Sequence, residues 1–352
     1  MIVAGAGMAG LVAAVRAREL GLAPVVYEKG TRPGGSMVLS SGVVWRHREW
    51  EVFRRECPAG DERLQRLVWE RLDDALEWLR SQGADVSAED TENPLTTGKR
   101  FDPRQLTDAL VQRTTALRIG EAAPLDGRGP TVLATGGFGG SPALVARHIR
   151  PAAPLRLRAN PWSTGDGLEH AVGRGAALSD AMDEFYGRNM PDTPWTEAEF
   201  VAAAQLYARH ARIFDEDGVE FFRADDVSWS ETNVAQATAT RPGARAYYVL
   251  TADALAEPAV AQRAGPLISP AALPFAPPLD AAAAVRVVAS ITHTIGGLRI
   301  DERARVIGVN GAAVDGLHAA GVDAGGVAAG GYASGLAQAL VLGLAAAEAL
   351  AA

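Results

Sequence analysis

The chain has 352 residues, a formal net charge of −8 and a single cysteine, Cys57. This length allows a large buried core and either two domains or one domain with an insertion. The acidic balance argues against nucleic acid or an anionic membrane as a partner. One cysteine excludes an iron–sulfur cluster, a Cys-rich zinc site and an internal disulfide, and we expect Cys57 to be half-buried and uninvolved.

The sequence shows neither a targeting segment nor a membrane span. It begins within an apolar run, and its most apolar stretch, residues 335–352, is Ala-rich and short for a bilayer. We therefore expect a cytoplasmic protein. The six histidines show no metal-ligand spacing, so no metal is predicted.

The N-terminal segment has the pattern of a dinucleotide-binding turn. An apolar run precedes Gly5, Gly7 and Gly10, a helix-like stretch follows, and a second apolar run ends at Glu28. The first glycine permits a tight turn, the second lets a pyrophosphate approach the backbone, and the third lets the helix pack on the strand. The carboxylate of Glu28 is then placed to accept from ribose hydroxyls.

Further along, the pattern continues as an α/β chain with an interruption. Helices are predicted over 60–83 and from Pro103 to about Leu117, the second capped by Asp102. A short strand at 131–133 and a loop and helix over 164–178 follow. Aromatic residues and prolines concentrate over 190–287, which indicates an inserted domain. We predict a nucleotide-binding domain over 1–189 and 288–352 and a substrate or cap domain over 190–287.

Five stretches identify the kind of dinucleotide. "EKGTRPGGSMVLSSGVVW" places Gly34 and Gly35 soon after Glu28, as in flavoproteins whose loop wraps the cofactor. "VLATGGFGG" (132–140), "TGDGLEHAVGRGAAL" (164–178), "HTIGGLRID" (293–301) and "GLHAAGVDAGGVAAGGYASGLAQALVLG" (316–343) follow in order. Together they resemble the FAD-dependent fumarate reductase and 3-ketosteroid dehydrogenase family, and the ketosteroid branch more closely.

The resemblance implies an α/β fold, with a Rossmann-like FAD-binding domain of the GR2 type and an inserted α+β cap domain. That family has a long β-meander before "VLATGG", where this chain has only "RIGEAAPLDGRGP", so a trimmed FAD domain is expected. The residues expected to bind FAD are Gly5, Gly7, Met8, Ala9, Gly10, Glu28, Lys29, Gly34, Gly35, Ser36, Ser40, Gly42, Ala134, Thr135, Gly136, Thr164, Gly165, Asp166, Gly321, Gly335 and Leu336.

Four features refine the cofactor site. The glycines of "ATGG" let the chain cross close to the adenine end of FAD, and "TGDG" presents Asp166 or merely caps a helix. A last helix beginning near Ser334 would aim its positive end at the flavin, unless it is only a packed core helix. The family's covalent attachment uses a histidine where this chain has Gly34 or Gly35, so FAD is expected to be non-covalent.

The family moves a hydride between flavin and one carbon and a proton at the neighbouring carbon, beside a carbonyl or carboxylate. Fumarate reductases clamp a dicarboxylate with arginines, one of which lies in the last signature block. Here that block has Tyr332 and no arginine. In the cap, Trp229 stands near the place of a second arginine, and Arg223 is out of register. The pattern favours an apolar substrate.

The ketosteroid branch implies that Tyr332 polarises the substrate carbonyl, although Ala333 replaces the proline that follows that tyrosine and Gly335 or Leu336 stands for an assisting glycine. A cap tyrosine would remove the proton, with Tyr247, Tyr248 and Tyr207 as alternatives. His293 would donate to a carbonyl or be structural, and Tyr186 would line the substrate entrance. Each tyrosine has the alternative of being a buried aromatic with a satisfied hydroxyl.

The resulting hypothesis is an FAD-dependent dehydrogenase acting on CH–CH groups, with a small-molecule substrate and an external electron acceptor or donor. The reverse reaction, an enone or fumarate-type reduction, and a flavin-binding protein without catalysis remain alternatives. The trimmed FAD domain favours a homodimer.

Overall fold

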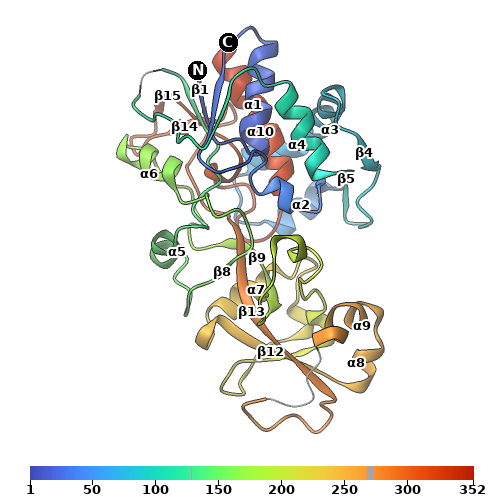
Figure 1. The fold of residues 1–352 in the computed structure, drawn as a ribbon. Helices are drawn as coiled ribbons and strands as arrows, with labels where there is room; N and C mark the ends of the chain where they lie inside the picture. The colour runs from blue at the N-terminus through green and yellow to red at the C-terminus, as the bar shows by residue number, and fades with distance from the viewer. Residues whose placement is uncertain (128, 268–272) are drawn as a thin grey trace. The chain divides into compact units, whose positions relative to one another are not determined.

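The computed structural model describes residues 1–127, 129–267 and 273–352, which form two compact units (Figure 1). The first unit contains residues 1–141, 160–184 and 293–352, and the second contains 142–159 and 185–292. The second unit thus begins five residues before the predicted boundary at 190 and also takes up 142–159. The reason is β8 (Arg156–Leu157), which pairs in parallel with β13 (Ala283–Thr294) of the second unit.

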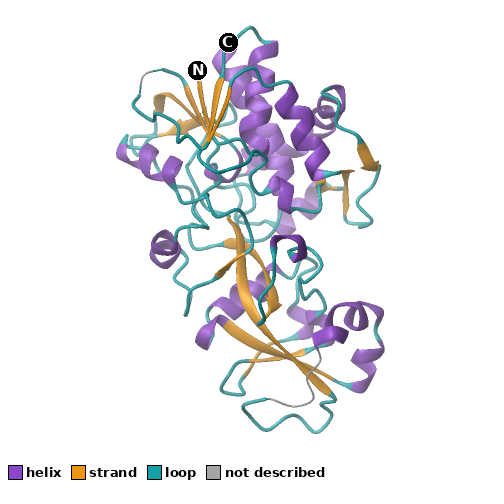
Figure 2. Cartoon of the chain, viewed as in Figure 1, coloured by secondary structure: helices purple, strands orange, loops and turns teal. Residues whose placement is uncertain are grey.

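The first unit is built on a largely parallel sheet in the order β14-β15-β7-β1-β2-β6 (Figure 2). The strands are β1 (Ile2–Ala4), β2 (Val25–Glu28), β6 (Leu117–Ile119), β7 (Thr131–Leu133), β14 (Arg305–Ile307) and β15 (Ala313–Ala319). Only β14 runs antiparallel to its neighbour. The central strands are apolar on both faces, as expected for a covered parallel sheet, and the predicted α/β fold is confirmed.

Two helices of this unit lie against each other along their length. They are α1 (Met8–Glu19) and α10 (Gly335–Ala351), and both are buried over most of their surface. Small residues allow this approach, since a Cβ on Gly343 would lie 2.7 Å from the carbonyl oxygen of Ala9. The Ala-rich C-terminal segment is therefore a core helix. Within the described residues, no helix combines the length and the hydrophobicity needed to cross a membrane.

Acidic residues cap two helices of the first unit, and the sequence predicts one of these caps, Asp102. Asp61 and Asp102 accept backbone N–H groups at the starts of α3 (Glu62–Ser81) and α4 (Pro103–Gln112). Helix α4 ends before the predicted Leu117 because that residue belongs to β6. The other elements are α2 (Trp50–Glu56), α6 (Asp166–Gly173) and a small sheet of β3 (Val43–His47), β4 (Val86–Ala88) and β5 (Thr96–Phe101). Residues 120–130 alone join β6 to β7, as the trimmed pattern predicts.

The second unit is a mixed sheet in the order β11-β10-β12-β13-β8, with β9 also paired to β13. Its strands include β9 (Phe185–Pro191), β10 (Arg212–Phe214), β11 (Glu220–Phe222) and β12 (Arg245–Leu250), and its helices are α5 (Pro142–His148), α7 (Thr232–Ala239), α8 (Ala252–Ala256) and α9 (Pro258–Ala264). Two hydrophobic clusters contain alternate residues of β12, with Tyr248 in one and Tyr247 in the other. The predicted proline-rich stretch lies partly outside the described residues, at 268–272.

Buried histidines make the stability of this fold depend on pH. His318 in β15 is 6% exposed, and burial lowers its pKa to about 4. The unfolded chain takes up a proton near pH 6.5, whereas the folded chain does so only near 4, so stability falls as the pH drops between these values. At pH 5 this costs about 2 kcal/mol. We expect His318→Leu to reduce the loss in unfolding free energy between pH 7 and 5 by that amount, measured by urea unfolding. An unchanged pH dependence would contradict the assignment.

Candidate functional site

The turn between β1 and α1 is a close crossing of backbone segments. Gly5 has φ 107°, and a Cβ there would overlap the carbonyl oxygen of Ala134. A Cβ on Gly10 would overlap the carbonyl oxygen of Gly5 and lie 3.2 Å from Val3. A Cβ on Gly7, in contrast, would meet only Gly35, at 4.0 Å. The first and third glycines are thus required by packing, while Gly7 leaves space at the start of the helix.

The second glycine pair lies beside this turn. The Gly34 N–H donates to the carbonyl oxygen of Ala6 at 2.7 Å, and a Cβ on Gly35 would lie 3.2 Å from the Cα of Gly7. Helix α1 begins at Met8 with no side-chain cap on its N-terminus. Two glycine loops and the N–H groups of a helix start therefore meet at one place, which is suited to a pyrophosphate.

Glu28 is the last residue of β2, and its carboxylate binds the backbone of two loops, the turn after β1 and the loop after β2. Its Oε2 accepts from the Ala6 N–H at 2.9 Å, and its Oε1 accepts from the Gly30 N–H at 2.7 Å. The residue as a whole is 7% exposed. Each carboxylate oxygen can accept more than one hydrogen bond, so Glu28 retains the capacity to bind a ribose hydroxyl.

A second polar cluster joins Lys29, which follows Glu28, to the "TGDG" turn. The Nζ of Lys29 donates to Thr164 Oγ1 and to Asp166 Oδ2, both at 2.6 Å, and Thr164 Oγ1 donates to Asp166 Oδ1 at 2.8 Å. Gly165 precedes α6 in the left-handed conformation. Residues separated by about 135 positions in sequence thus form one cluster at the carboxyl ends of the strands.

Asp323 was missed by the sequence reasoning. It is 1% exposed; its carboxylate accepts from the N–H of Thr135, from Thr135 Oγ1 at 2.9 Å and from the Gly137 N–H at 3.0 Å. Burial raises the pKa of Asp323, and these hydrogen bonds oppose the shift. The residue ties the predicted loop of Ala134, Thr135 and Gly136 to the segment after Gly321. Asp323 lies in the short helical turn Gly321–Asp323 after β15, and its partners are distant in sequence, so no local signal identifies it.

Asn160 was also missed and connects the glycine loop to the "TGDG" segment. Its Nδ2 donates to Ser36 Oγ at 2.8 Å and to Ser163 Oγ at 3.1 Å. Ser36 therefore belongs to the site region. Ser40 and Gly42 serve the loop itself, because the Gly42 N–H donates to Ser40 Oγ at 3.1 Å and a Cβ on Gly42 would overlap the Phe101 carbonyl oxygen.

The N-terminus of α10 lies beside His293. Ser334 caps the helix by accepting the Ala337 N–H at 3.2 Å, and a Cβ on Gly335 would lie 3.1 Å from His293 Nε2. His293 Nδ1 is 3.1 Å from the Thr294 carbonyl oxygen, which can only accept, so this contact assigns the proton to Nδ1. Burial lowers the pKa of His293. The predicted donation by His293 to a substrate carbonyl, and its structural alternative, stay predictions.

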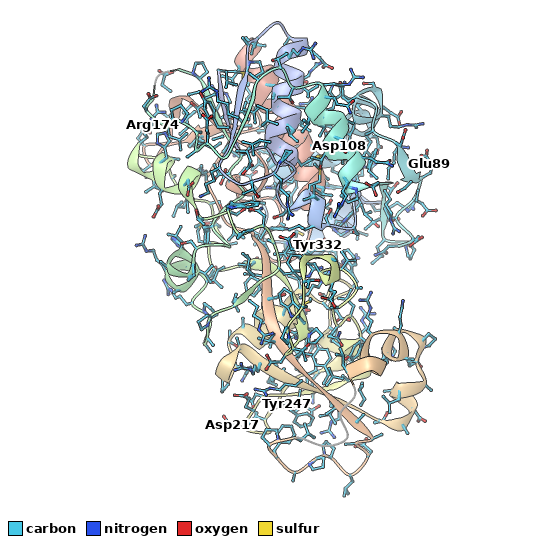
Figure 3. The ribbon with its side chains drawn as sticks, viewed as in Figure 1. Glu89, Asp108, Arg174, Asp217, Tyr247 and Tyr332 are labelled. Carbon is cyan, nitrogen blue, oxygen red and sulfur yellow. The ribbon has the colours of Figure 1, made fainter. Side chains whose placement is uncertain are left out.

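The two glycines before Tyr332 pack closely against neighbouring backbone and side chains. A Cβ on Gly331 would overlap the carbonyl oxygen of Glu56, and the Gly330 N–H donates to Glu184 Oε2 at 2.8 Å. Cys57, predicted to be half-buried, is fully buried, and burial raises the pKa of its thiol to about 12. The centroid of the Tyr332 ring lies 5.4 Å from that of the Trp45 ring. Figure 3 labels Tyr332 in the first unit. Tyr332 is thus a partly exposed residue just before α10.

The other candidate tyrosines belong to the second unit. The hydroxyl of Tyr207 donates to Gln205 Oε1 at 2.7 Å, and that of Tyr248 accepts from Asn189 Nδ2 at 3.0 Å; both rings are 1% exposed. Tyr247 is enclosed by an aromatic cluster with Phe214 and Phe275. These environments suit core aromatics. Tyr186 is partly exposed, with the Arg188 guanidinium 4.8 Å from its ring.

Among the residues that the structure describes, no group of histidine, cysteine and acidic side chains is arranged to hold a metal ion.

The fold and the glycine-lined site define a dinucleotide-binding α/β protein. The profile of the FAD binding domain family matches residues 1–123 and 125–336, and the chain belongs to that family. Its cofactor is FAD. The donors fit this group: a helix start with open space at Gly7, and polar side chains at Glu28 and at the Lys29 cluster. A comparison with curated proteins found no match.

Solved structures share the fold over nearly the whole chain. The 3-ketosteroid-Δ4-(5α)-dehydrogenase of Rhodococcus jostii RHA1, solved with 4-androstene-3,17-dione, is 18% identical with a TM-score of 0.74 and coverage of 100% of this chain and 96% of that one. The 3-ketosteroid Δ1-dehydrogenase of Sterolibacterium denitrificans, solved with 1,4-androstadiene-3,17-dione, is 16% identical, with a TM-score of 0.74 and coverage of 99% and 98%. A flavocytochrome c3 fumarate reductase is 20% identical, with a TM-score of 0.71 and coverage of 99% and 77%. The predicted resemblance is confirmed.

The crossing at Gly10 provides a test of the site. Because a Cβ there would overlap backbone, Gly10→Ala should lower the unfolding free energy by about 3 kcal/mol and abolish FAD retention. The matched control is Gly173→Ala in α6, where a Cβ would meet nothing within 4 Å. FAD content by absorbance and the melting temperature measure both effects. Full FAD retention in Gly10→Ala would contradict the proposed packing.

Proposed function

We propose that this protein is an FAD-dependent oxidoreductase that forms a C=C bond next to a carbonyl in an apolar, cyclic substrate. The observation that carries the proposal is Tyr332, a partly exposed phenol fixed directly before the N-terminus of α10. The segment 325–338 contains no arginine to bind a carboxylate. The shared fold with two ketosteroid dehydrogenases supports the same substrate class.

In this reaction FAD and Tyr332, both assigned to the first unit, have separate roles. When bound, FAD supplies the two-electron acceptor for a hydride. The Tyr332 hydroxyl donates a hydrogen bond to the substrate carbonyl oxygen, which stabilises the negative charge that develops there when the neighbouring carbon loses a proton. The close packing of Gly331 against the Glu56 carbonyl group keeps the neighbouring phenol in place. A hydrogen-bond donor that is already in position stabilises the developing charge without further reorganisation.

The start of α10 contributes through its charge. Its N-terminal dipole favours negative charge close to the helix start. We infer that this end of the helix stabilises the reduced, anionic form of the cofactor. Gly34 and Gly35 occupy the loop where a histidine would be needed for attachment, so the proposal includes non-covalent FAD and an external electron acceptor.

The proposed activity is tested under anaerobic conditions with the purified holoprotein. Saturated cyclic ketones and 3-ketosteroids should bleach the flavin absorbance, whereas succinate should leave it unchanged. If the chemically reduced protein is instead reoxidised by enones, the reverse direction is the physiological one. Rapid bleaching by succinate, or turnover of fumarate, would contradict the apolar substrate class.

Tyr332→Phe removes only the hydroxyl and should slow flavin reduction by about 10²- to 10³-fold, because one donor to a developing oxyanion is lost. FAD content should stay unchanged. The control is Tyr27→Phe in β2, whose ring packs against Arg118. Stopped-flow absorbance gives both rates, and equal rates in the two variants would exclude the role of Tyr332.

A further inference from the structure

Trp45 brings an aromatic ring against the proposed carbonyl-binding residue. It lies in β3 and is buried, and the centroid of its ring is 5.4 Å from that of Tyr332, with the two ring planes inclined by 58°. Tilted rings at this distance attract each other beyond the effect of burying their surface. Both residues belong to the first unit, so the contact lies within one compact part of the chain. The ring of Trp45 therefore borders the place that Tyr332 occupies.

The backbone of Trp45 is fixed at both edges of β3. On one edge, β5 pairs Gly98 with Trp45, and a Cβ on Gly98 would lie 2.6 Å from the Trp45 Cα. On the other edge, the Trp45 N–H donates to Ser334 Oγ at 3.4 Å, and the same oxygen caps α10. Ser334 is the second residue after Tyr332. Strand β3 and the segment that carries Tyr332 are thus connected by a hydrogen bond as well as by the ring contact.

His47 supports the Trp45 ring from the interior of the first unit. The two residues are two positions apart in β3, so their side chains lie on the same face. The His47 ring is buried, meets the Trp45 ring edge-on at 5.3 Å between centroids, and lies 5.2 Å from the Phe53 ring. Burial lowers the pKa of His47 to about 4, and the backbone of Tyr332 opposes the shift. At neutral pH the imidazole is therefore uncharged and packs as an aromatic ring.

We propose that Trp45, supported by His47, is a positioning residue that holds the Tyr332 ring in one orientation for the reaction proposed above, and the inference rests on that function. A phenol can rotate about its side-chain bonds even where the backbone is fixed. A hydrogen-bond donor stabilises developing charge most effectively when it is already in place. The contact with Trp45 limits this rotation and so keeps the hydroxyl of Tyr332 where the substrate carbonyl oxygen would lie.

The first test combines substitutions in the FAD-loaded protein. The substrate is whichever cyclic ketone or 3-ketosteroid reduces the wild-type flavin fastest, at saturation. Trp45→Leu removes the ring contact and should slow flavin reduction by about 10-fold, because misplacing a catalytic group by a fraction of an ångström is costly. Trp45→Phe keeps an aromatic ring and should recover most of the rate. In the Tyr332→Phe background, Trp45→Leu should cause no further slowing, since the donor that it positions is already absent.

The matched control is Trp78→Leu. Trp78 is a partly exposed residue of α3 whose indole N–H donates to Glu19 Oε2 at 2.9 Å. This substitution also removes an indole from the first unit, but it should leave the rate of flavin reduction unchanged in both backgrounds. FAD content and the melting temperature show whether each variant is folded and loaded.

A second readout does not depend on turnover. The chain has six tyrosines, and incorporation of fluorotyrosine gives each of them a fluorine NMR resonance. The resonance that is missing in Tyr332→Phe belongs to Tyr332. Because Trp45→Leu removes the ring current of the indole, it should shift this resonance, whereas Trp78→Leu should leave it in place.

A shifted Tyr332 resonance, together with slowing that disappears in the Tyr332→Phe background, supports the proposal. An unshifted resonance overturns it, and so does equal slowing in both backgrounds, which is what a purely structural role of Trp45 would give. If Trp45→Leu retains no FAD, Trp45→Phe decides by the resonance, because a phenyl ring in place of the indole also changes the ring current at Tyr332. A wild type that no ketone reduces contradicts the proposed function, whereas the fluorine spectra still show whether Trp45 orders Tyr332.

Discussion

The structure of the FAD-binding unit depends on one constraint, the close crossing of backbone at the end of β1. The Gly5 turn meets the Ala134 carbonyl group, and Gly10 brings the start of α1 against Gly5. A side chain at either position would separate strand, helix and neighbouring strand. Because the backbone segments approach so closely here, the second glycine loop can lie against Gly7. Within the described part of the chain, no side chain then caps the amide groups at the start of α1, which face the cofactor site.

The same backbone crossing also fixes the position of the proposed catalytic residue, Tyr332, in the first unit. Helix α1 packs along α10, and Gly343 allows the close approach. The N-terminus of α10 is thereby fixed relative to the cofactor-binding turn, with Ser334, Gly335 and Tyr332 at its start. A helix made almost entirely of small and aliphatic residues thus acts as the spacer between nucleotide binding and the proposed carbonyl-binding tyrosine.

The sequence was sufficient where the physics is local. Glycine spacing predicts the turn, Asp102 predicts the start of α4, and the sequence places the start of the last helix near Ser334, because each feature involves residues a few positions apart. Asp323 and Asn160 could not be assigned, since their partners lie more than 100 positions away in sequence. Tyrosine content alone could not distinguish a partly exposed residue such as Tyr332 from the core residues Tyr207 and Tyr248.

The most direct test of the central claim is the structure of the product from one anaerobic turnover. A ketone that bleaches the flavin should be recovered, by mass spectrometry and NMR, with two hydrogens fewer and a new C=C bond conjugated to its carbonyl, in one equivalent per FAD. Recovery of a product oxidised elsewhere, such as at a hydroxyl group with the carbon skeleton unchanged, would contradict the account.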